Sequence, residues 1–136
     1  MSTAETHPGV ACPIKHAALT SINVRDADAA VAFWRDRVGF ELRRNEPYGE
    51  DARWIELFPP GAESGLTLTT PGNSLWQEPG GWAPVLFATD DIDAAVEQMR
   101  ERGVEFTGPV MRPGGGPPPM VFFVDQDGSQ FLLVER

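Results

Sequence analysis

The sequence contains few of the residues from which covalent cross-links and metal sites are usually built. Cys12 is the one cysteine among 136 residues, which excludes an intrachain disulfide and a cysteine-rich zinc module. His7 and His16 are the two histidines, and they leave little room for histidine-based metal or triad chemistry. No uninterrupted apolar run approaches the roughly 18 residues of a membrane-spanning helix. The first ten residues also lack the basic and apolar segments of a signal peptide, so we expect a cytoplasmic protein.

Basic residues are also scarce. The chain has 11 lysines and arginines against 20 aspartates and glutamates, for a formal net charge of -9. Nucleic acids and anionic membranes are bound mainly through lysine and arginine, so we expect neither as a partner. A neutral or cationic small molecule is compatible with this balance. Hydrophobic residues make up 41% of the chain and charged residues 23%, which is typical of one folded globular domain.

The pattern of apolar alternation and turn residues occurs twice along the chain. The first half predicts one strand, one helix and three strands, at 18–24, 27–37, 40–44, 53–58 and 66–70, with turns at 46–49 and 59–61. The second half predicts the same order at 85–89, 92–102, 104–107, 120–124 and 130–134. Seven identities at an offset of 65 positions support a duplication, and among them Asp26 matches Asp91 as the predicted helix N-cap.

This repeat predicts an α+β fold built from two tandem βαβββ modules. The modules are expected at 14–74 and 75–136, and they form one structural domain over 14–136. Residues 1–13 lack periodicity and predict a flexible N-terminal tail. The Gly/Pro-rich stretch 108–119 has two interpretations, a surface connection between strands or a lid over a ligand site.

Several short motifs resemble one known family. The segments 24–26, 32–36 and 38–40 are similar to its strand–Asp–helix opening, and 125–129 is similar to its terminal Asp-rich turn, with 102–106 fitting its second half. On these motifs the chain resembles the glyoxalase, bleomycin-resistance and extradiol-dioxygenase superfamily, also called vicinal oxygen chelate proteins. The resemblance implies curved mixed sheets around a cavity (the glyoxalase/bleomycin resistance fold) and commonly a homodimer. The superfamily includes enzymes and binding proteins, so the site has to decide the function.

The resemblance also implies where a metal would be held. Metal-dependent members carry His or Glu in the first and last strand of each module. Those positions correspond here to Leu19, Pro84, Leu132 and either Thr67 or Leu68. These side chains lack the carboxylate, imidazole or thiolate donors that a divalent metal needs. We therefore expect no metal and no cofactor, and we place a metal-dependent lyase or dioxygenase third among the possible functions.

Strand alternation predicts which side chains face the cavity. The predicted ligand-binding residues are mostly apolar or aromatic, with a few polar groups: Ser21, Asn23, Trp54, Glu56, Phe58, Trp76, Trp82, Leu86, Gln130 and Leu132. Such a wall is typical of a small-molecule site. Trp76 and Trp82 flank a Gly/Pro connector. There they either cover a dimer interface or stack on a ligand. Glu56 is either paired with a nearby arginine or available as an acid/base.

These residues favour two functions. The first is a metal-free protein of the bleomycin-resistance type that sequesters an aromatic or cationic small molecule without chemistry. The second is a metal-independent isomerase, cyclase or lyase in which Glu56 is the acid/base and Ser21, Asn23 or Gln130 holds a developing oxyanion. A change in the mass or skeleton of the ligand would separate the second function from the first.

Overall fold

The computed structural model describes residues 9–136. The first part of the predicted tail, with His7, lies outside the described residues. The first half contains β1 (Leu19–Asn23), α1 (Ala27–Ala32), η1 (Phe33–Val38), β2 (Glu41–Tyr48), β3 (Ala52–Phe58) and β4 (Gly65–Thr69). The second half contains β5 (Trp82–Thr89), α2 (Ile92–Glu101), β6 (Glu105–Phe106), β7 (Met120–Val124) and β8 (Gln130–Glu135). Among these residues no helix is long and apolar enough to cross a membrane.

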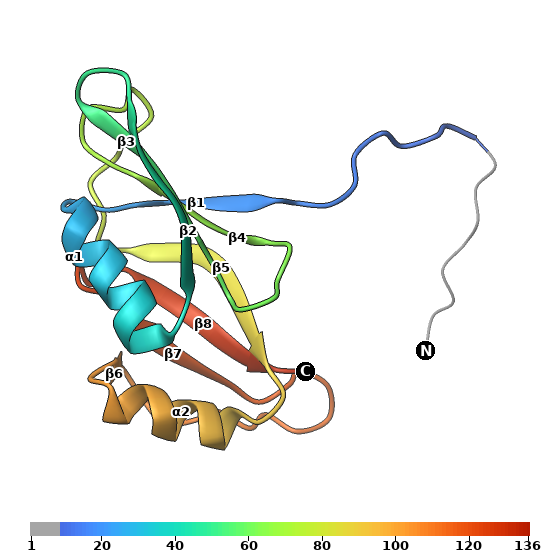
Figure 1. The fold of residues 1–136 in the computed structure, drawn as a ribbon. Coiled ribbons are helices and arrows are strands. Elements are labelled where there is room, and N and C mark those ends of the chain that lie inside the picture. The colour runs from blue at the N-terminus through green and yellow to red at the C-terminus, as the bar shows by residue number, and fades with distance from the viewer. Residues whose placement is uncertain (1–8) are drawn as a thin grey trace.

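The strands form two four-stranded sheets with the same topology. The order is β1-β4-β3-β2 in the first sheet and β5-β8-β7-β6 in the second. In each sheet the first and last strands of the module pair in parallel, and the other neighbours pair antiparallel. Figure 1 shows each sheet with its own helix packed on one face. This arrangement confirms the predicted α+β class and the glyoxalase/bleomycin resistance fold.

Both helices begin as the sequence predicts. The carboxylate of Asp26 accepts a 3.1 Å hydrogen bond from the backbone N–H of Ala29, and Asp91 does the same for Ala94 at 3.1 Å. Each aspartate thereby satisfies one of the N–H groups that a helix leaves without a partner in its first turn. The two matched aspartates are therefore equivalent caps in the two modules.

The first helix ends in a widened turn that the sequence pattern did not predict. Its second half, η1, is a π-helix, and the carbonyl of Trp34 accepts from both Gly39 N–H (3.0 Å) and Phe40 N–H (2.8 Å). Gly39 has a φ of 102°, a conformation that favours glycine. The extra backbone in the turn lets the chain leave the helix and enter β2 directly.

The second strand is longer than predicted, and the predicted turn at 46–49 is wrong. β2 runs to Tyr48, and the hairpin turn lies at 49–51. Pro47 suggested a turn because proline cannot donate to a neighbouring strand. β2, however, is the edge strand of its sheet, where one row of N–H groups has no strand partner. The longer hairpin carries Tyr48 past the body of the sheet, toward the site described below.

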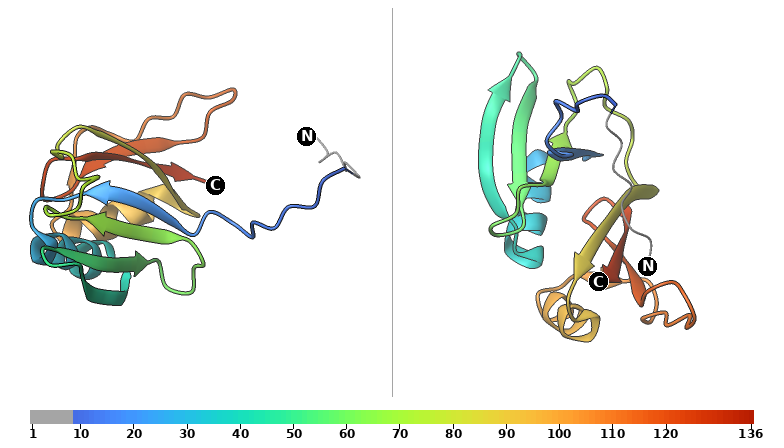
Figure 2. Two further views of the ribbon diagram at one scale, coloured as in Figure 1. Left: turned by 90° about the horizontal axis from the view of Figure 1, so that it is seen from above. Right: turned by 90° about the vertical axis from the view of Figure 1, so that its right-hand side faces the viewer.

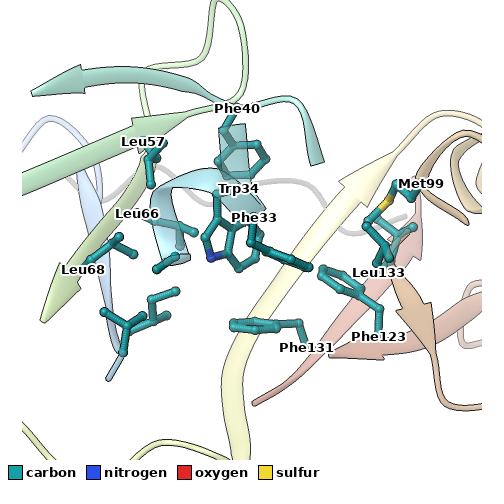
Figure 3. Close-up of a cluster of buried hydrophobic side chains, with 14 of the residues drawn as sticks. Phe33, Trp34, Phe40, Leu57, Leu66, Leu68, Met99, Phe123, Phe131 and Leu133 are labelled. Carbon is teal, nitrogen blue, oxygen red and sulfur yellow. The ribbon is translucent and has the colours of Figure 1, made fainter. Parts of the chain in front are cut away.

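The core lies between the helices and the sheets and is centred on Trp34. This side chain is fully buried. Its ring lies 5.1 Å from the ring of Phe131, 5.3 Å from Phe40 and 5.5 Å from Phe87. Figure 3 shows this aromatic cluster, to which both modules contribute. Neither module could bury such a cluster alone, so the two halves form one core.

The Gly/Pro-rich stretch 108–119 projects from the body between β6 and β7. Figure 2 shows it as an extended loop reaching outward from the second sheet. It is held at its base, where Met111 and Met120 form an isolated backbone bridge. The guanidinium of Arg112 also contacts the carboxylate of Asp93 on α2 at 2.6 Å. These contacts fix where the loop begins and ends.

Candidate functional site

The first sheet presents a polar row on the face that points away from α1. We call this the open face, because Ile22, Ile55 and Leu66 fill the opposite face and are buried against the helix. The strand register places four residues side by side across the open face, one from each strand: Ser21, Thr67, Glu56 and Arg44. Two hydroxyls, a carboxylate and a guanidinium therefore share one row.

Trp54 and Glu56 are linked on this face. The indole Nε1 of Trp54 donates a 2.6 Å hydrogen bond to Oε2 of Glu56, two residues further along β3. Arg44 Nη1 lies 3.9 Å from the same oxygen, and its Nη2 donates to Glu46 at 2.9 Å. The Glu56 side chain is only 16% exposed. The carboxylate therefore holds the indole in one orientation and is itself balanced by an arginine.

Beside Trp54 the open face hollows into a cavity of about 640 Å³, which we call the first-sheet cavity. Its size is in the range of small-molecule sites. The ring of Tyr48 contacts that of Trp54 edge-on, with 5.8 Å between the ring centres. The walls come from all four strands of the first sheet, the 49–51 turn and the segment after β4. They include Ser21, Tyr48, Glu50, Asp51, Arg53, Trp54, Thr67, Thr69, Asn73, Ser74 and Leu75. The cavity thus offers two aromatic rings, several hydroxyls, two carboxylates and one guanidinium.

A smaller cavity of about 290 Å³ lies next to it, between β1 and β5. It is lined by polar backbone and by side chains from both modules, including Ser21, Asn23, Gln77, Glu78, Trp82 and Ser129. Ser21 lines both cavities, so they adjoin at β1. The two cavities together run from the first sheet to the seam between the modules.

The connector between the modules, residues 70–81, borders both cavities and is anchored at several points. The indole Nε1 of Trp76 donates a 2.8 Å hydrogen bond to the carbonyl of Val24. The side-chain oxygen of Asn23 accepts from the Gln77 N–H at 3.0 Å. On the other side, Gly80 N–H donates to the Ser129 hydroxyl at 3.1 Å. Trp76 therefore fixes the connector to the end of β1.

Arg25 contacts both the connector and the turn before β8 at the seam between the two modules. Its guanidinium contacts Glu78 of the connector, donates to the carbonyl of Pro79 at 3.1 Å, and lies 3.4 Å from Asp127 in the turn before β8. Its backbone N–H also donates to Asp127 at 3.1 Å. The hydrogen bond from Arg25 to Glu78 raises the pKa of the guanidinium. This arginine links the first module, the connector and the second module.

The corresponding face of the second sheet is apolar. Leu132 pairs with Leu86 on one side and with Phe122 on the other, and Trp82 pairs with Gln130. The ring of Trp82 lies 6.0 Å from that of Phe122. Leu86 and Trp82 are exposed, whereas Leu132 is buried. The two sheets thus present different chemistry, polar on the first and apolar on the second.

The residues at the family's metal positions do not fit a metal ion. The register pairs Leu19 with Gly65, Ser21 with Thr67 and Leu86 with Leu132, so hydrocarbon and hydroxyl groups occupy these rows. Within residues 9–136 no group of three or more His, Cys, Asp and Glu side chains could hold a metal. His16 is exposed and precedes β1. We therefore derive no chemistry through a metal.

Asp125 is the one carboxyl with a strongly raised pKa among the described residues. It lies in the turn before β8, where its Oδ1 accepts 2.9 Å hydrogen bonds from Asp127 N–H and Ser129 N–H. Its Oδ2 is buried with no hydrogen-bond partner among the described residues. Burial raises the pKa of Asp125 to about 6, although the two N–H bonds act in the opposite direction. Asp125 organises the turn from which Asp127 reaches Arg25.

The structure brings together only some of the predicted site residues. Ser21 and Trp54 line the first-sheet cavity, and Ser21, Asn23 and Trp82 line the smaller one. The other predicted residues are not among those that line the two cavities. Glu56 accepts from Trp54, Trp76 lies in the connector, and the second sheet carries Leu86, Gln130 and Leu132. Phe58 is buried beneath the guanidinium of Arg43, 4.2 Å from its ring centre.

Sequence reasoning missed the part of the cavity that comes from loops. Tyr48 was interpreted as a turn residue, and Asp51, Asn73, Ser74 and Leu75 had no periodicity to mark them. Thr67 corresponds to a metal position of the family and lacks a metal-binding group. Alternation on β4 could nevertheless have marked its side chain as a hydroxyl that faces the cavity. The loop residues gave no such signal, because their position depends on tertiary packing.

Comparison with known proteins places the chain in a family. The model of the Glyoxalase/Bleomycin resistance protein/Dioxygenase superfamily matches residues 14–133. The uncharacterized protein YetH of Bacillus subtilis (strain 168) is 34% identical over 122 residues, covering 90% of this chain and 99% of that protein. A crystal structure of a superfamily member from Sphaerobacter thermophilus DSM 20745 matches with a TM-score of 0.82 and 34% identity, covering 90% of this chain and 98% of that one. The crystal structure of TnmS3, an antibiotic binding protein from Streptomyces sp. CB03234, matches with a TM-score of 0.77 and 30% identity, covering 92% and 98%.

Proposed function

We propose that this chain, which belongs to the Glyoxalase/Bleomycin resistance protein/Dioxygenase superfamily, is a metal-free binding protein that sequesters a planar aromatic, cationic small molecule in the first-sheet cavity. The observation that carries the proposal is the cavity of about 640 Å³ beside Trp54. The similarity to TnmS3, an antibiotic binding protein, supports a binding role, and we propose a protein of the antibiotic-resistance type. Such a protein protects by holding its ligand, so it needs no chemical step.

The cavity walls support an aromatic ligand. Trp54 and Tyr48 offer ring surface, and the bond to Glu56 holds the indole before a ligand arrives. Aromatic stacking contributes on the order of 1 kcal/mol per ring beyond burial, and a fixed ring loses little entropy on binding. Ser21 and Thr67 supply hydroxyls that would orient the ligand. We propose these four residues as the core of the site.

The charge around the cavity supports a cation. Glu50 and Asp51 line it against a single guanidinium, Arg53, which is engaged with the side chain of Asn45 at 2.9 Å. A cation is also attracted by the face of an indole ring. The net charge of -9 would steer a cation toward the protein, in a manner that salt weakens.

The same proposal includes a homodimer and a cytoplasmic location.

Asn23 and Trp82 line the smaller cavity, where they would extend the site toward the seam between the modules. Leu86 and Leu132 would contribute apolar surface beyond it, and Gln130 would contribute a polar amide. Trp76 would support the site by holding the connector, whereas Phe58 packs beneath Arg43.

A second function is a metal-independent isomerase, cyclase or lyase that uses Glu56 as acid/base. The observation that favours it is the position of this carboxylate in the same row as two hydroxyls, with a side chain only 16% exposed. Its Oε2, however, accepts from Trp54, and Glu56 is not among the residues that line the first-sheet cavity. A binding role therefore fits the geometry better than proton transfer.

Titration with ethidium, a planar aromatic cation, tests the proposal. We expect ethidium to quench the tryptophan fluorescence of the EDTA-treated protein in a saturable manner. One ethidium should bind per chain, and the mass of the ethidium should not change. Trp54→Leu should lower the affinity about tenfold, because it removes the stacking surface. Phe106→Leu is the matched control, since Phe106 lies on β6 outside both cavities. Equal affinity in the wild type and Trp54→Leu would contradict the proposal.

A further inference from the structure

A third cavity lies between the two modules, on the side of the sheets where the helices pack. Its volume is about 220 Å³, and it shares no lining residue with the two cavities described above. We call it the Met99 pocket. One wall comes from the chain around the ends of η1 and β3, and the other comes from β5, α2, β7 and β8. The walls include Val38, Phe40, Pro59, Phe87, Met99 and Leu133.

The Met99 pocket is lined almost entirely by hydrocarbon. Within residues 9–136, Thr89 is the one lining residue with a polar side chain, and none of the lining side chains is charged. Met99, Phe123 and Leu133 are buried, and Figure 3 shows them together at one side of the aromatic cluster. Phe87 packs on the same core but is only half-buried, so apolar surface is accessible from solvent here. An apolar cavity of about 150 Å³ can hold benzene, so the pocket has room for a hydrocarbon group.

The repeat at an offset of 65 positions shows which side chain leaves this space open. Met99 in α2 corresponds to Trp34 in the first module, just as Ala95 corresponds to Ala30. Trp34 fills its part of the core with a fully buried indole. A methionine side chain is smaller and more flexible than an indole. Met99 therefore leaves room that a tryptophan at the same position would take.

An arginine lies at the rim of the Met99 pocket. A Cβ built on Gly39 would lie 3.4 Å from Nη1 of Arg102. Gly39 is the residue between Val38 and Phe40, which both line the pocket, so the guanidinium lies beside this wall. Among the ion pairs of residues 9–136, none involves Arg102. The rim thus carries a positive charge next to an apolar space.

The matched arginine of the first module has different surroundings. Arg37 reaches across to the second module in the same way, since a Cβ on Gly103 would lie 3.7 Å from its Nη1. The cavity of about 260 Å³ beside Arg37 is also lined by Glu105 and Asp125. Carboxylates therefore accompany Arg37, whereas the walls beside Arg102 supply none among the described residues.

We propose that the Met99 pocket binds a small amphipathic carboxylate, with its hydrocarbon chain in the pocket and its anionic group at Arg102. The hydrocarbon would displace water from Phe87, Met99 and Leu133, which is favourable because apolar surface is removed from solvent. The guanidinium of Arg102 would donate charge-assisted hydrogen bonds to the carboxylate. This site is separate from the first-sheet cavity and takes a ligand of the opposite charge, so it does not depend on the proposed function.

Isothermal titration calorimetry with octanoate tests the inference. We expect one octanoate per chain, with an affinity about 15-fold higher than that of hexanoate, because two more methylene groups are buried. Arg102→Gln should weaken octanoate binding about fivefold and leave the affinity for octanol unchanged, since the alcohol carries no charge. Arg37→Gln is the matched control and should bind octanoate as the wild type does. Absence of saturable octanoate binding, or equal losses in the two arginine variants, would overturn the inference.

The methyl group of Met99 reports where octanoate binds. In protein with isotope-labelled methionine methyl groups, octanoate should shift the NMR signal of Met99 and leave that of Met111, in the 108–119 loop, unchanged. Met99→Trp should lower octanoate affinity more than about tenfold, because the larger ring takes the space of the ligand. Urea denaturation checks that this core variant is folded, and the surface variant Arg102→Gln decides the question if it is not. A shift at Met111 in place of Met99, or full octanoate affinity in folded Met99→Trp, would contradict the assignment.

Discussion

Trp54 donates its indole N–H to the carboxylate of Glu56 over 2.6 Å, between two residues that point to the same side of β3. The bond joins the aromatic wall of the first-sheet cavity to the polar row behind it. The Glu56 carboxylate accepts from the indole and faces Arg44, so both contacts keep the Trp54 ring in one orientation. The relationship makes Glu56 a positioning residue for Trp54 in the binding account.

Substitution of Glu56 separates positioning from proton transfer. Glu56→Gln keeps an oxygen that accepts from the indole, so we expect ethidium affinity within about twofold of the wild type. Glu56→Leu removes the acceptor and should lower affinity several-fold by releasing Trp54. Isothermal titration calorimetry measures both. If Glu56→Gln abolished conversion of a ligand while sparing its affinity, Glu56 would be an acid/base instead.

Trp76→Phe tests the anchor of the connector. The variant keeps an aromatic ring but loses the 2.8 Å hydrogen bond to the Val24 carbonyl. We expect a loss of about 1 kcal/mol in the free energy of unfolding, because a partly buried carbonyl is left without its partner. Urea denaturation measures this loss. Unchanged stability would show that the connector is held without the indole.

Gly72→Ala tests the close approach between the connector and the 49–51 turn. Gly72 has a φ of +98°, and a Cβ there would lie 2.6 Å from the carbonyl oxygen of Asp51. Gly49→Ala is the matched control, since Gly49 also has a positive φ (+68°) but nothing within 4 Å of its Cβ position. The control should lose about 1 kcal/mol and Gly72→Ala about 1–3 kcal/mol more, with weaker ethidium binding. Equal losses in the two variants would contradict the predicted clash.

Asp125 predicts how stability depends on pH. Burial raises its pKa to about 6 in the folded protein, above the value of an unfolded aspartate. Its protonated form is therefore favoured by folding, and this contribution is complete below about pH 4 and lost as the pH rises through 6. The wild type should lose on the order of 1–3 kcal/mol relative to Asp125→Asn between pH 4 and pH 7. Denaturation at several pH values measures the difference, and a difference independent of pH would refute the assignment.

The fold followed from the sequence because its signals are local and occur twice. Asp26 and Asp91 cap their helices as predicted, and the repeated order of elements gave two sheets of equal topology. The family match confirms the resemblance carried by the motifs. The predicted end of β2 was wrong, because Pro47 was interpreted as part of a turn. Proline is tolerated in an edge strand, and β2 is the edge strand of its sheet.

The site could be predicted only where it lies on strands. Alternation placed Ser21 and Trp54 on the open face, and both line the cavity. The contributions of Asp51 and Asn73 depend on how two loops pack against each other, which no local pattern records. Trp76 illustrates the same limit, since its bond to Val24 joins segments 52 residues apart.

Native mass spectrometry of the EDTA-treated protein with ethidium distinguishes metal-free binding from metal-dependent binding and from chemical conversion. We expect one ethidium per chain, bound without a metal ion and unchanged in mass after prolonged incubation, and we expect Trp54→Leu to lose most of this complex. A complex that forms only when iron, zinc, nickel or manganese is restored, or a ligand released with an altered mass, would contradict the proposed function.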